Sequence, residues 1–164
     1  MQTKTLETLF HDTLKDVYFA ERQILKALPK MIDAAKSPDL AEGLTKHLTE
    51  TQGQVDRLEQ VFAIIGKSVQ AKTCPAIEGI LKEGSELMKE YADSPALDAA
   101  LVGAGQAVEH YEIARYGTLC AWAELLGYDD AMALLQETLD EELAADKALS
   151  EVAMDVNQLA IAAE

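Results

Sequence analysis

Carboxylate and amide side chains recur near the middle of four long helical patterns in this chain. The seven positions are Glu21, Glu50, Gln54, Glu109, Glu112, Glu142 and Asp146. At about 100° per residue, each falls within the apolar stripe of its helix or at the edge of that stripe. Oxygen donors gathered in a protein core are typical ligands of hard metal ions such as manganese, magnesium and iron. The pattern therefore predicts a metal site.

The spacing of these side chains repeats along the chain. Glu21 precedes Glu50 by 29 residues, and Glu112 precedes Glu142 by 30. In each half, the second glutamate is followed four residues later by another oxygen donor, which shares its helix face. We interpret the chain as a duplicated helical hairpin. Each copy brings one Glu from its first helix, and a Glu with a second oxygen donor from its next helix.

Six acids in one buried layer need compensation. A buried carboxylate without a partner is strongly unfavourable, and converging carboxylates also repel one another. The three arginines, Arg22, Arg57 and Arg115, lie off the central lines of the stripes. Two divalent cations would offset most of the six negative charges, and the oxygen-rich ligands suit manganese, magnesium or iron. The other interpretation is a polar core layer of protonated carboxylates and hydrogen bonds.

Several further polar side chains near this layer have two interpretations each. His47, three residues before Glu50, is either a core histidine that orients its neighbours or an auxiliary ligand. The tyrosines either pack with hydrogen-bonded hydroxyls or have a redox or outer-layer role; they are Tyr18, Tyr111 and Tyr116. Away from the stripe centres, we expect His110 and Glu141 to face outward and His11 to lie at a stripe edge.

Four long helices are needed to bring these residues together. Residues typical of helix starts and ends predict helices over residues 5–35, 38–65, 95–126 and 130–160, with a short helix over 75–91. Ser37-Pro38 and Ser94-Pro95 each predict an N-cap followed by a proline, and Asp129 predicts another N-cap. Gly66 and Gly127 predict helix ends. Pro29 should kink its helix or shorten the last turn.

The connections between these helices are unequal in length. The first and last pairs are joined tightly and should form antiparallel hairpins. A long crossover over residues 67–94 separates the two hairpins. This is the ferritin-like connection of a four-helix bundle, whereas an up-down bundle has three short loops. We therefore predict an all-α, ferritin-like four-helix bundle in a single domain over residues 1–164.

Composition and charge exclude several classes of protein. The 164 residues are 49% hydrophobic and only 5% aromatic, which favours helices over a β-sandwich. The 29 acids against 14 bases give a net charge of −15, which argues against nucleic acid and anionic lipid as partners. No apolar run is long enough to span a membrane. With no signal-peptide pattern and two cysteines that form no disulfide framework, we expect a cytoplasmic protein.

Short segments along nearly the whole chain resemble a known group of proteins. They are AERQ at 20–23, ALPK at 27–30, HLTETQGQ at 47–54, VEHYEIA at 108–114, LGY at 126–128 and TLDEE at 138–142. The chain resembles the ferritin-like di-iron and di-manganese carboxylate proteins. More specifically, it is similar to the bacterial YciF family of stress-associated ferritin-like proteins. This resemblance implies a bundle with two metal ions per chain, iron or alternatively manganese, related to rubrerythrins and paired as a homodimer.

The sequence also departs from the general ferritin-like pattern. That pattern has Glu-x-x-His on the second and fourth helices, but Gly53 and Ala145 stand at the histidine positions. One residue later, Gln54 and Asp146 offer oxygen instead. The departure argues against rubrerythrin-like peroxidase chemistry and favours a site of different potential, or a manganese site.

The resemblance leads to one main functional hypothesis. In this hypothesis, a di-metal protein carries out redox chemistry on oxygen or peroxide in stress defence. An external donor would reduce the oxidised metal, because the sequence has no Cys-x-x-Cys pair. The primary metal ligands would be Glu21, Glu50, Glu112 and Glu142, completed by Glu109, Gln54 and Asp146. The alternative is a non-enzymatic dimeric stress or interaction protein with a structural or vestigial metal site. Iron storage in a cage is disfavoured, because no fifth C-terminal helix follows.

Overall fold

Five helices make up nearly all of the chain. The computed structural model describes residues 4–163, and within them there is no strand. The helices are α1 (Leu6–Ala34), α2 (Pro38–Ile64), α3 (Pro75–Glu90), α4 (Leu97–Leu126) and α5 (Asp129–Ala162). The predicted all-α class is confirmed, and every expected helix is present within a few residues of its expected bounds. None of the described helices is both long and apolar enough to cross a membrane.

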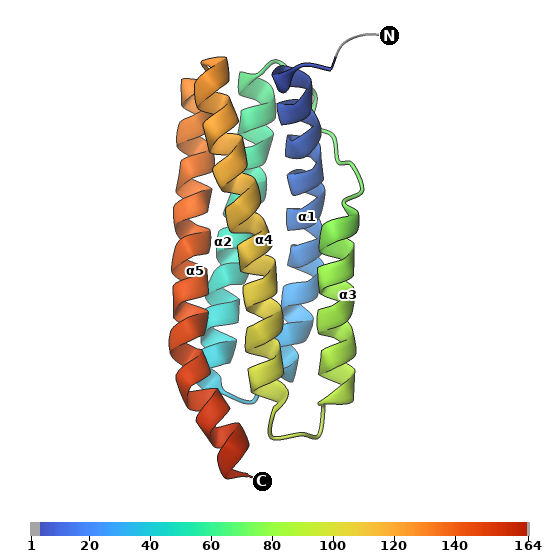
Figure 1. The fold of residues 1–164 in the computed structure, drawn as a ribbon, viewed down its shortest axis with the longest axis vertical. Coiled ribbons are helices and arrows are strands. Elements are labelled where there is room, and N and C mark those ends of the chain that lie inside the picture. Colours follow the sequence, from blue (N-terminus) through green and yellow to red (C-terminus); the bar gives the residue numbers. More distant parts are fainter. Residues whose placement is uncertain (1–3, 164) are drawn as a thin grey trace.

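The four long helices stand side by side in one bundle (Figure 1). Tight turns join α1 to α2 and α4 to α5, and each pair runs antiparallel. The shorter α3 lies along the outside against α1 and α4, and it returns the chain to the end where α2 begins. As a result, α2 and α4 run in the same direction, which is the ferritin-like connectivity.

Two of the predicted helix starts need correction. The serine of Ser94-Pro95 does not cap α4, because its hydroxyl accepts the amide of Ala96 in a local turn (3.1 Å), and the helix begins only at Leu97. Asp129 is the first residue of α5 rather than its cap, which is Tyr128. By contrast, Ser37 caps α2 as predicted, and its hydroxyl accepts the amide of Leu40 at 3.4 Å.

Pro29 does not shorten α1, which continues to Ala34. The proline lies on the exposed face of the helix. A carbonyl that lacks its amide partner can be hydrated on that face, so the helix tolerates the lost hydrogen bond.

Glycines end two helices, as the sequence predicts. Gly66 and Gly127 have φ values of +66° and +72°, in the left-handed region. After Gly127, the amide of Tyr128 returns to the carbonyl of Ala123 at 2.9 Å, which closes the end of α4.

The left-handed backbone makes Gly127 sensitive to substitution. We expect Gly127→Ala to destabilise the protein by about 1–2 kcal/mol, because an L side chain is strained at positive φ. Gly117→Ala is the matched control, since Gly117 lies inside α4 and a Cβ there meets nothing within 4 Å. That control should be neutral or slightly stabilising. Urea denaturation of both variants measures the difference, and equal effects would contradict the prediction.

The apolar core of the bundle is divided in two. One cluster, around Phe10, Phe62 and Leu119, fills the end near the α4–α5 turn. The other, around Leu40, Leu101 and Leu149, fills the end near the α1–α2 turn. A layer of buried polar side chains lies between them at mid-height. The fold therefore encloses this layer with apolar side chains above and below.

Candidate metal centre

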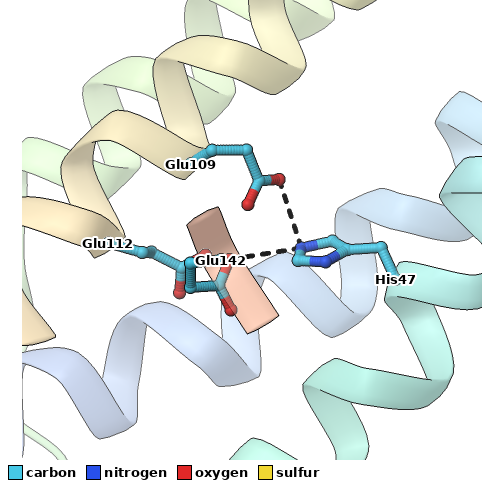
Figure 2. A group of neighbouring side chains, drawn as sticks. All are labelled: His47, Glu109, Glu112 and Glu142. Carbon is cyan, nitrogen blue, oxygen red and sulfur yellow. Dashed lines mark ion pairs between the residues drawn. The ribbon is translucent and has the colours of Figure 1, made fainter. Parts of the chain in front are cut away.

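Six polar side chains from all four long helices form the buried layer. They are Glu21 of α1, His47 and Gln54 of α2, Glu109 and Glu112 of α4, and Glu142 of α5, and each is at most 5% exposed. One possible ligand atom from each of four of them lies within 4.8 Å of the others (Figure 2). These four are His47, Glu109, Glu112 and Glu142. We refer to them as the metal-ligand group, because their spacing would allow them to hold one metal ion.

His47 points its ring into this group (Figure 2). Its Nε2 atom lies 3.3 Å from a carboxylate oxygen of Glu109 and 4.0 Å from one of Glu142. Neither ring nitrogen makes a hydrogen bond with the described residues. A histidine kept for core hydrogen bonding would have a partner for each nitrogen, so the geometry favours the auxiliary-ligand interpretation.

Two of the six acids expected in the core are only half-buried. The side chain of Glu50 is 22% exposed, and one of its oxygens forms an ion pair with Lys46 at 3.1 Å. Its other oxygen lies 4.0 Å from Nδ1 of His47. Asp146 is 23% exposed and faces His110, whose Nε2 is 3.2 Å away. The side chain of Gln106 also donates to Asp146 at 3.2 Å. Partners at the bundle surface therefore hold both carboxylates toward the edge of the layer.

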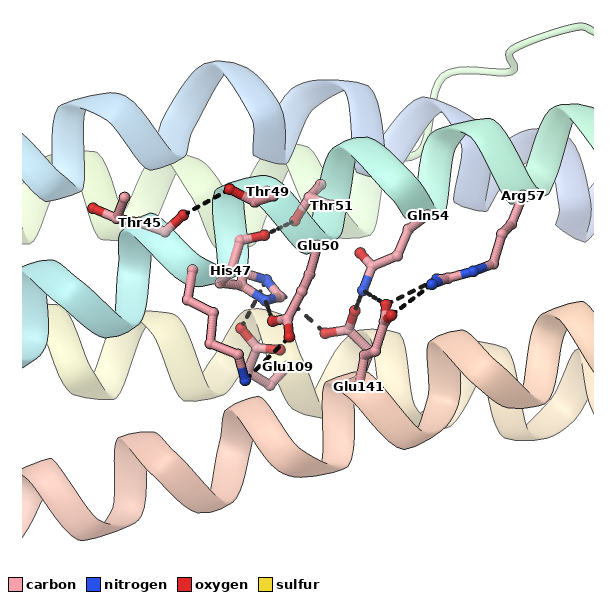
Figure 3. A network of polar contacts seen from close by, with 11 residues as sticks. Thr45, His47, Thr49, Glu50, Thr51, Gln54, Arg57, Glu109 and Glu141 are labelled. Atoms are coloured by element: carbon pink, nitrogen blue, oxygen red, sulfur yellow. Dashed lines mark hydrogen bonds and ion pairs between the residues drawn. The ribbon is translucent and has the colours of Figure 1, made fainter.

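A hydrogen-bonded network extends from the layer toward the surface (Figure 3). The side-chain nitrogen Nε2 of Gln54 donates a hydrogen bond to the carboxylate of Glu142 and another, at 3.0 Å, to that of Glu141. The guanidinium of Arg57 donates one hydrogen bond to each carboxylate oxygen of Glu141, at 2.8 and 2.6 Å. Burial raises the pKa of Glu141, but the hydrogen bonds from Arg57 and Gln54 outweigh it and hold that pKa below its usual value. The network fixes Gln54 with its amide nitrogen toward Glu142.

The sequence prediction missed this network. Glu141 was expected to point away from the stripe, and it does leave the metal-ligand group, but it ends a chain of contacts that reaches Glu142. Gln54 was expected to offer oxygen, and its oxygen has no hydrogen-bond partner among the described residues. Arg57 is 84 residues from Glu141, so no local pattern connects them.

Replacing Arg57 tests how far its two-pronged contact matters. We expect Arg57→Lys to destabilise the protein by about 1–2 kcal/mol, because lysine cannot bond both oxygens of Glu141 at once. Arg22→Lys is the control, since Arg22 is exposed, forms no ion pair with the described residues, and has its guanidinium 5.6 Å from the centre of the Tyr18 ring. Thermal unfolding of the two variants measures the difference. If Arg57→Lys were as stable as Arg22→Lys, the bidentate contact would contribute little.

The tyrosines near the layer differ in their partners. Tyr116 is fully buried and donates its hydroxyl to Glu21. Burial, reinforced by the charge of Glu21, raises the pKa of Tyr116. Tyr18 instead donates to Glu59 at 2.8 Å, and the hydroxyl of Tyr111 lies 3.0 Å from the sulfur of Cys74. Tyr116 is thus the tyrosine that orients a carboxylate of the layer.

Three acids of the layer, Glu21, Glu109 and Glu112, have raised pKa values in the metal-free protein. Burial raises the pKa of Glu21 and Glu112 well above the usual value, and repulsion between neighbouring carboxylates adds to this effect. Burial and contact with Glu142 raise the pKa of Glu109 to about 11. A bound metal ion reverses this situation because it favours the charged form of each ligand.

The donor set fits iron or manganese. Within residues 4–163, ten buried side-chain nitrogen or oxygen atoms lack a hydrogen-bond partner, and eight of them belong to this layer. Native cores rarely leave polar atoms unsatisfied, so such a concentration points to a missing partner. Carboxylate oxygens with one imidazole nitrogen and one amide oxygen are ligands that both metals accept.

Comparison with known proteins agrees with the fold and with the resemblance noted from the sequence. A model of a domain of unknown function, DUF892, matches residues 5–162. Protein YciF of Escherichia coli is 42% identical over 156 residues, which cover 94% of each chain. A protein from Xanthomonas campestris, XCC3681, is 20% identical with a TM-score of 0.74 over 95% of this chain and 94% of that one, and it supports the fold alone.

Two more similar solved structures have nearly the same fold. The crystal structure of the E. coli stress protein YciF has a TM-score of 0.91 and 41% identity, covering 95% of this chain and 99% of that one. YcfI of Rhodopseudomonas palustris, described as a candidate structural protein, has a TM-score of 0.87 and 55% identity, covering 89% and 93%. The chain therefore belongs to the YciF family, and its matched domain is DUF892.

Proposed function

We propose that the buried layer binds two ions of iron or manganese, and that the protein uses them for redox chemistry on dioxygen or peroxide during stress. The observation that carries this proposal is the concentration of unpartnered atoms, because eight of them converge in one layer of acids. Cations satisfy the oxygens and the charge together.

The proposed ligands follow from the contacts. The metal-ligand group would hold one ion, and Glu21 with the free oxygen of Gln54 would help to hold the second. Glu50 would join at the edge, since its carboxylate faces both His47 and solvent. Asp146 would not contact the ions directly but would act on Glu109 through its negative charge. Bound iron or manganese would supply one-electron redox chemistry and attraction for oxygen-containing ligands.

The residues of the chain prepare this site in three ways. Tyr116 holds one oxygen of Glu21 and leaves the other free. Gln54 does the same for Glu142, and Arg57 fixes the carboxylate of Glu141 beside it. The two apolar core clusters exclude water above and below the layer. Ligands held in this way need little rearrangement when an ion binds.

The biological setting is also a proposal. The relative from E. coli is described as a stress protein, and we extend that role to this chain. We further propose a homodimer in the cytoplasm that receives electrons from an external donor, with a small oxidant as substrate. These partners rest on the family resemblance and on the absence of a Cys-x-x-Cys pair in the sequence.

Metal analysis tests the proposal directly. The protein is purified without added metal, then loaded with ferrous iron or manganese and analysed by mass spectrometry. We expect about two ions per chain in the wild type and a clear loss in Glu142→Gln. Glu151→Gln, an exposed acid on the same helix, is the control and should bind as the wild type does. A wild type that binds neither metal would overturn the proposal.

Turnover separates the redox proposal from a scaffold role. The loaded protein should consume dioxygen or peroxide in the presence of a chemical reductant. If it binds metal yet consumes neither oxidant, and the metal-free protein keeps its fold and its dimer, then the non-enzymatic alternative is favoured. The description of the Rhodopseudomonas relative as a candidate structural protein is consistent with that alternative.

A further inference from the structure

A small cavity leads from the bundle surface to the metal-ligand group. It lies between α2 and α5, has a volume of about 60 Å³, and ends at His47 and Glu109. Lys46 and Glu50 stand among the more exposed residues that line it. Since about 10–15 Å³ of such volume holds one water, a few water-sized molecules fit inside.

The inner end of the cavity carries polar atoms without partners. His47 is 5% exposed and Glu109 3%, so both are nine-tenths buried or more. Both ring nitrogens of His47 and one oxygen of Glu109 make no hydrogen bond with the described residues. Figure 3 shows the ring of His47 facing the carboxylates of Glu50 and Glu109, within ion-pair distance of both.

Small residues create the space. Ala145 and Ala148 line the cavity from α5, and Gly43 lines it from α2. Ala145 stands where the Glu-x-x-His pattern has its histidine, so the volume of an imidazole is left open at this position. A Cβ atom added at Gly43 would meet nothing within 4 Å. The departure from the ligand pattern thus opens a path, and His47 reaches the same group from another helix.

The walls determine which molecules can enter. Leu44, Leu149 and Val152 form an apolar stretch of the wall, and along that stretch a hydrated ion finds no polar atom to replace its water. A small uncharged molecule loses little on entering and can still bond to the atoms at the inner end. The charged side chains of Asp39, Lys46 and Glu50 line the more exposed part of the cavity, and the apolar stretch favours an uncharged molecule over a charged one.

We propose that this cavity is the binding and access site for a small uncharged oxidant of the size of dioxygen or hydrogen peroxide. The inference rests on the proposed function, because it names the substrate class and the route to the same site. The test therefore has one arm that needs no metal. It uses Ala145→Leu, which fills the cavity, and Ala144→Leu, which places the same side chain on the exposed side of α5.

The first arm places metal-free crystals under xenon pressure. Xenon binds in small apolar cavities, so we expect a xenon site between Leu44 and Leu149 in the wild type and in Ala144→Leu. Ala145→Leu should lack that site. Absence of xenon from this cavity in the wild type, or an unchanged site in Ala145→Leu, would overturn the proposal whether or not the protein binds metal.

The second arm measures access to bound iron. Ferrous protein is mixed with nitric oxide, an uncharged diatomic probe, and the absorbance change gives the association rate. In Ala145→Leu that has kept its iron, we expect the rate to fall by about tenfold or more, with no change in Ala144→Leu. An equal rate in all three proteins would place the access route elsewhere. Failure of the wild type to bind iron would contradict the proposed function instead, and the xenon result would still decide on the cavity.

Discussion

Without metal, the protein should lose stability as the pH rises from about 5.5 to about 8. Burial and neighbouring acids raise the pKa of Glu21, Glu109 and Glu112, and that of Glu109 reaches about 11. In the unfolded chain these carboxyls are already ionised above about pH 4.5. The native state therefore binds more protons than the unfolded state across this range, and each extra proton makes stability fall by about 1.4 kcal/mol per pH unit.

Metal should reverse this trend. Carboxylate and imidazole ligands must be deprotonated to bind a cation, so metal affinity and the stability that binding adds both rise with pH. Denaturation of metal-free and loaded protein at several pH values should give two curves that diverge as the pH rises. Glu109→Gln should flatten the metal-free curve because one titrating group is removed. A metal-free curve that is level or rises with pH would mean that the acids are ionised and compensated within the protein.

Helix periodicity was sufficient to place most of the layer. Glu21, Gln54, Glu112 and Glu142 each lie in an apolar stripe and near the middle of a long helix, and the structure buries all four. The same reasoning placed Glu109 toward a stripe edge, and it is buried as well. The angular position of a residue around its helix and its distance from the helix ends depend only on the local sequence, so both can be predicted from it.

Contacts between helices could not be predicted in this way. Glu50 and Asp146 have suitable helical angles, but Lys46, Gln106 and His110 hold them toward the surface. The periodicity of one helix does not show which side chains a neighbouring helix supplies. The contact of Arg57 with Glu141 is of the same kind, because it depends on the relative rotation and height of α2 and α5.

Turn geometry explains the error at α4. Ser94-Pro95 matches the sequence pattern of a capped helix start, but the serine hydroxyl bonds to the amide of Ala96 instead. The carboxylate of Asp98, in the first turn of α4, accepts the amides of Lys36 and Ser37 at 2.8 Å each. This contact holds the α1–α2 turn against the start of α4. It joins residues about 60 positions apart, so a local capping pattern does not reveal it.

Glu112 should show the conflict between stability and metal binding most clearly. It is 1% exposed, and neither of its carboxylate oxygens has a hydrogen-bond partner among the described residues. In metal-free protein at about pH 7.5, we expect Glu112→Gln to increase the free energy of unfolding by about 1–3 kcal/mol. Glutamine has nearly the same shape and is neutral in both the folded and the unfolded state, so folding no longer requires the uptake of a proton at this position. Its amide can also donate to a neighbouring carboxylate.

The same substitution should weaken metal binding by more than about 100-fold, because it removes a ligand and not merely a group that orients one. Calorimetric titration with manganese measures the affinity, and urea denaturation of the metal-free protein measures the stability. Glu124→Gln is the matched control, since Glu124 is an exposed acid of the same helix, and it should change neither quantity.

The effects of Glu112→Gln on metal-free stability and on metal affinity together distinguish the two interpretations of the acid layer. A layer built for structure, with protonated acids in satisfied hydrogen bonds, should lose stability when any member is changed. A layer built for metal is destabilising until the ion arrives, so removing one acid should stabilise the metal-free protein and impair the loaded one. If metal-free Glu112→Gln were less stable than the wild type, the acids would serve the core itself, and the metal proposal would lose its physical basis.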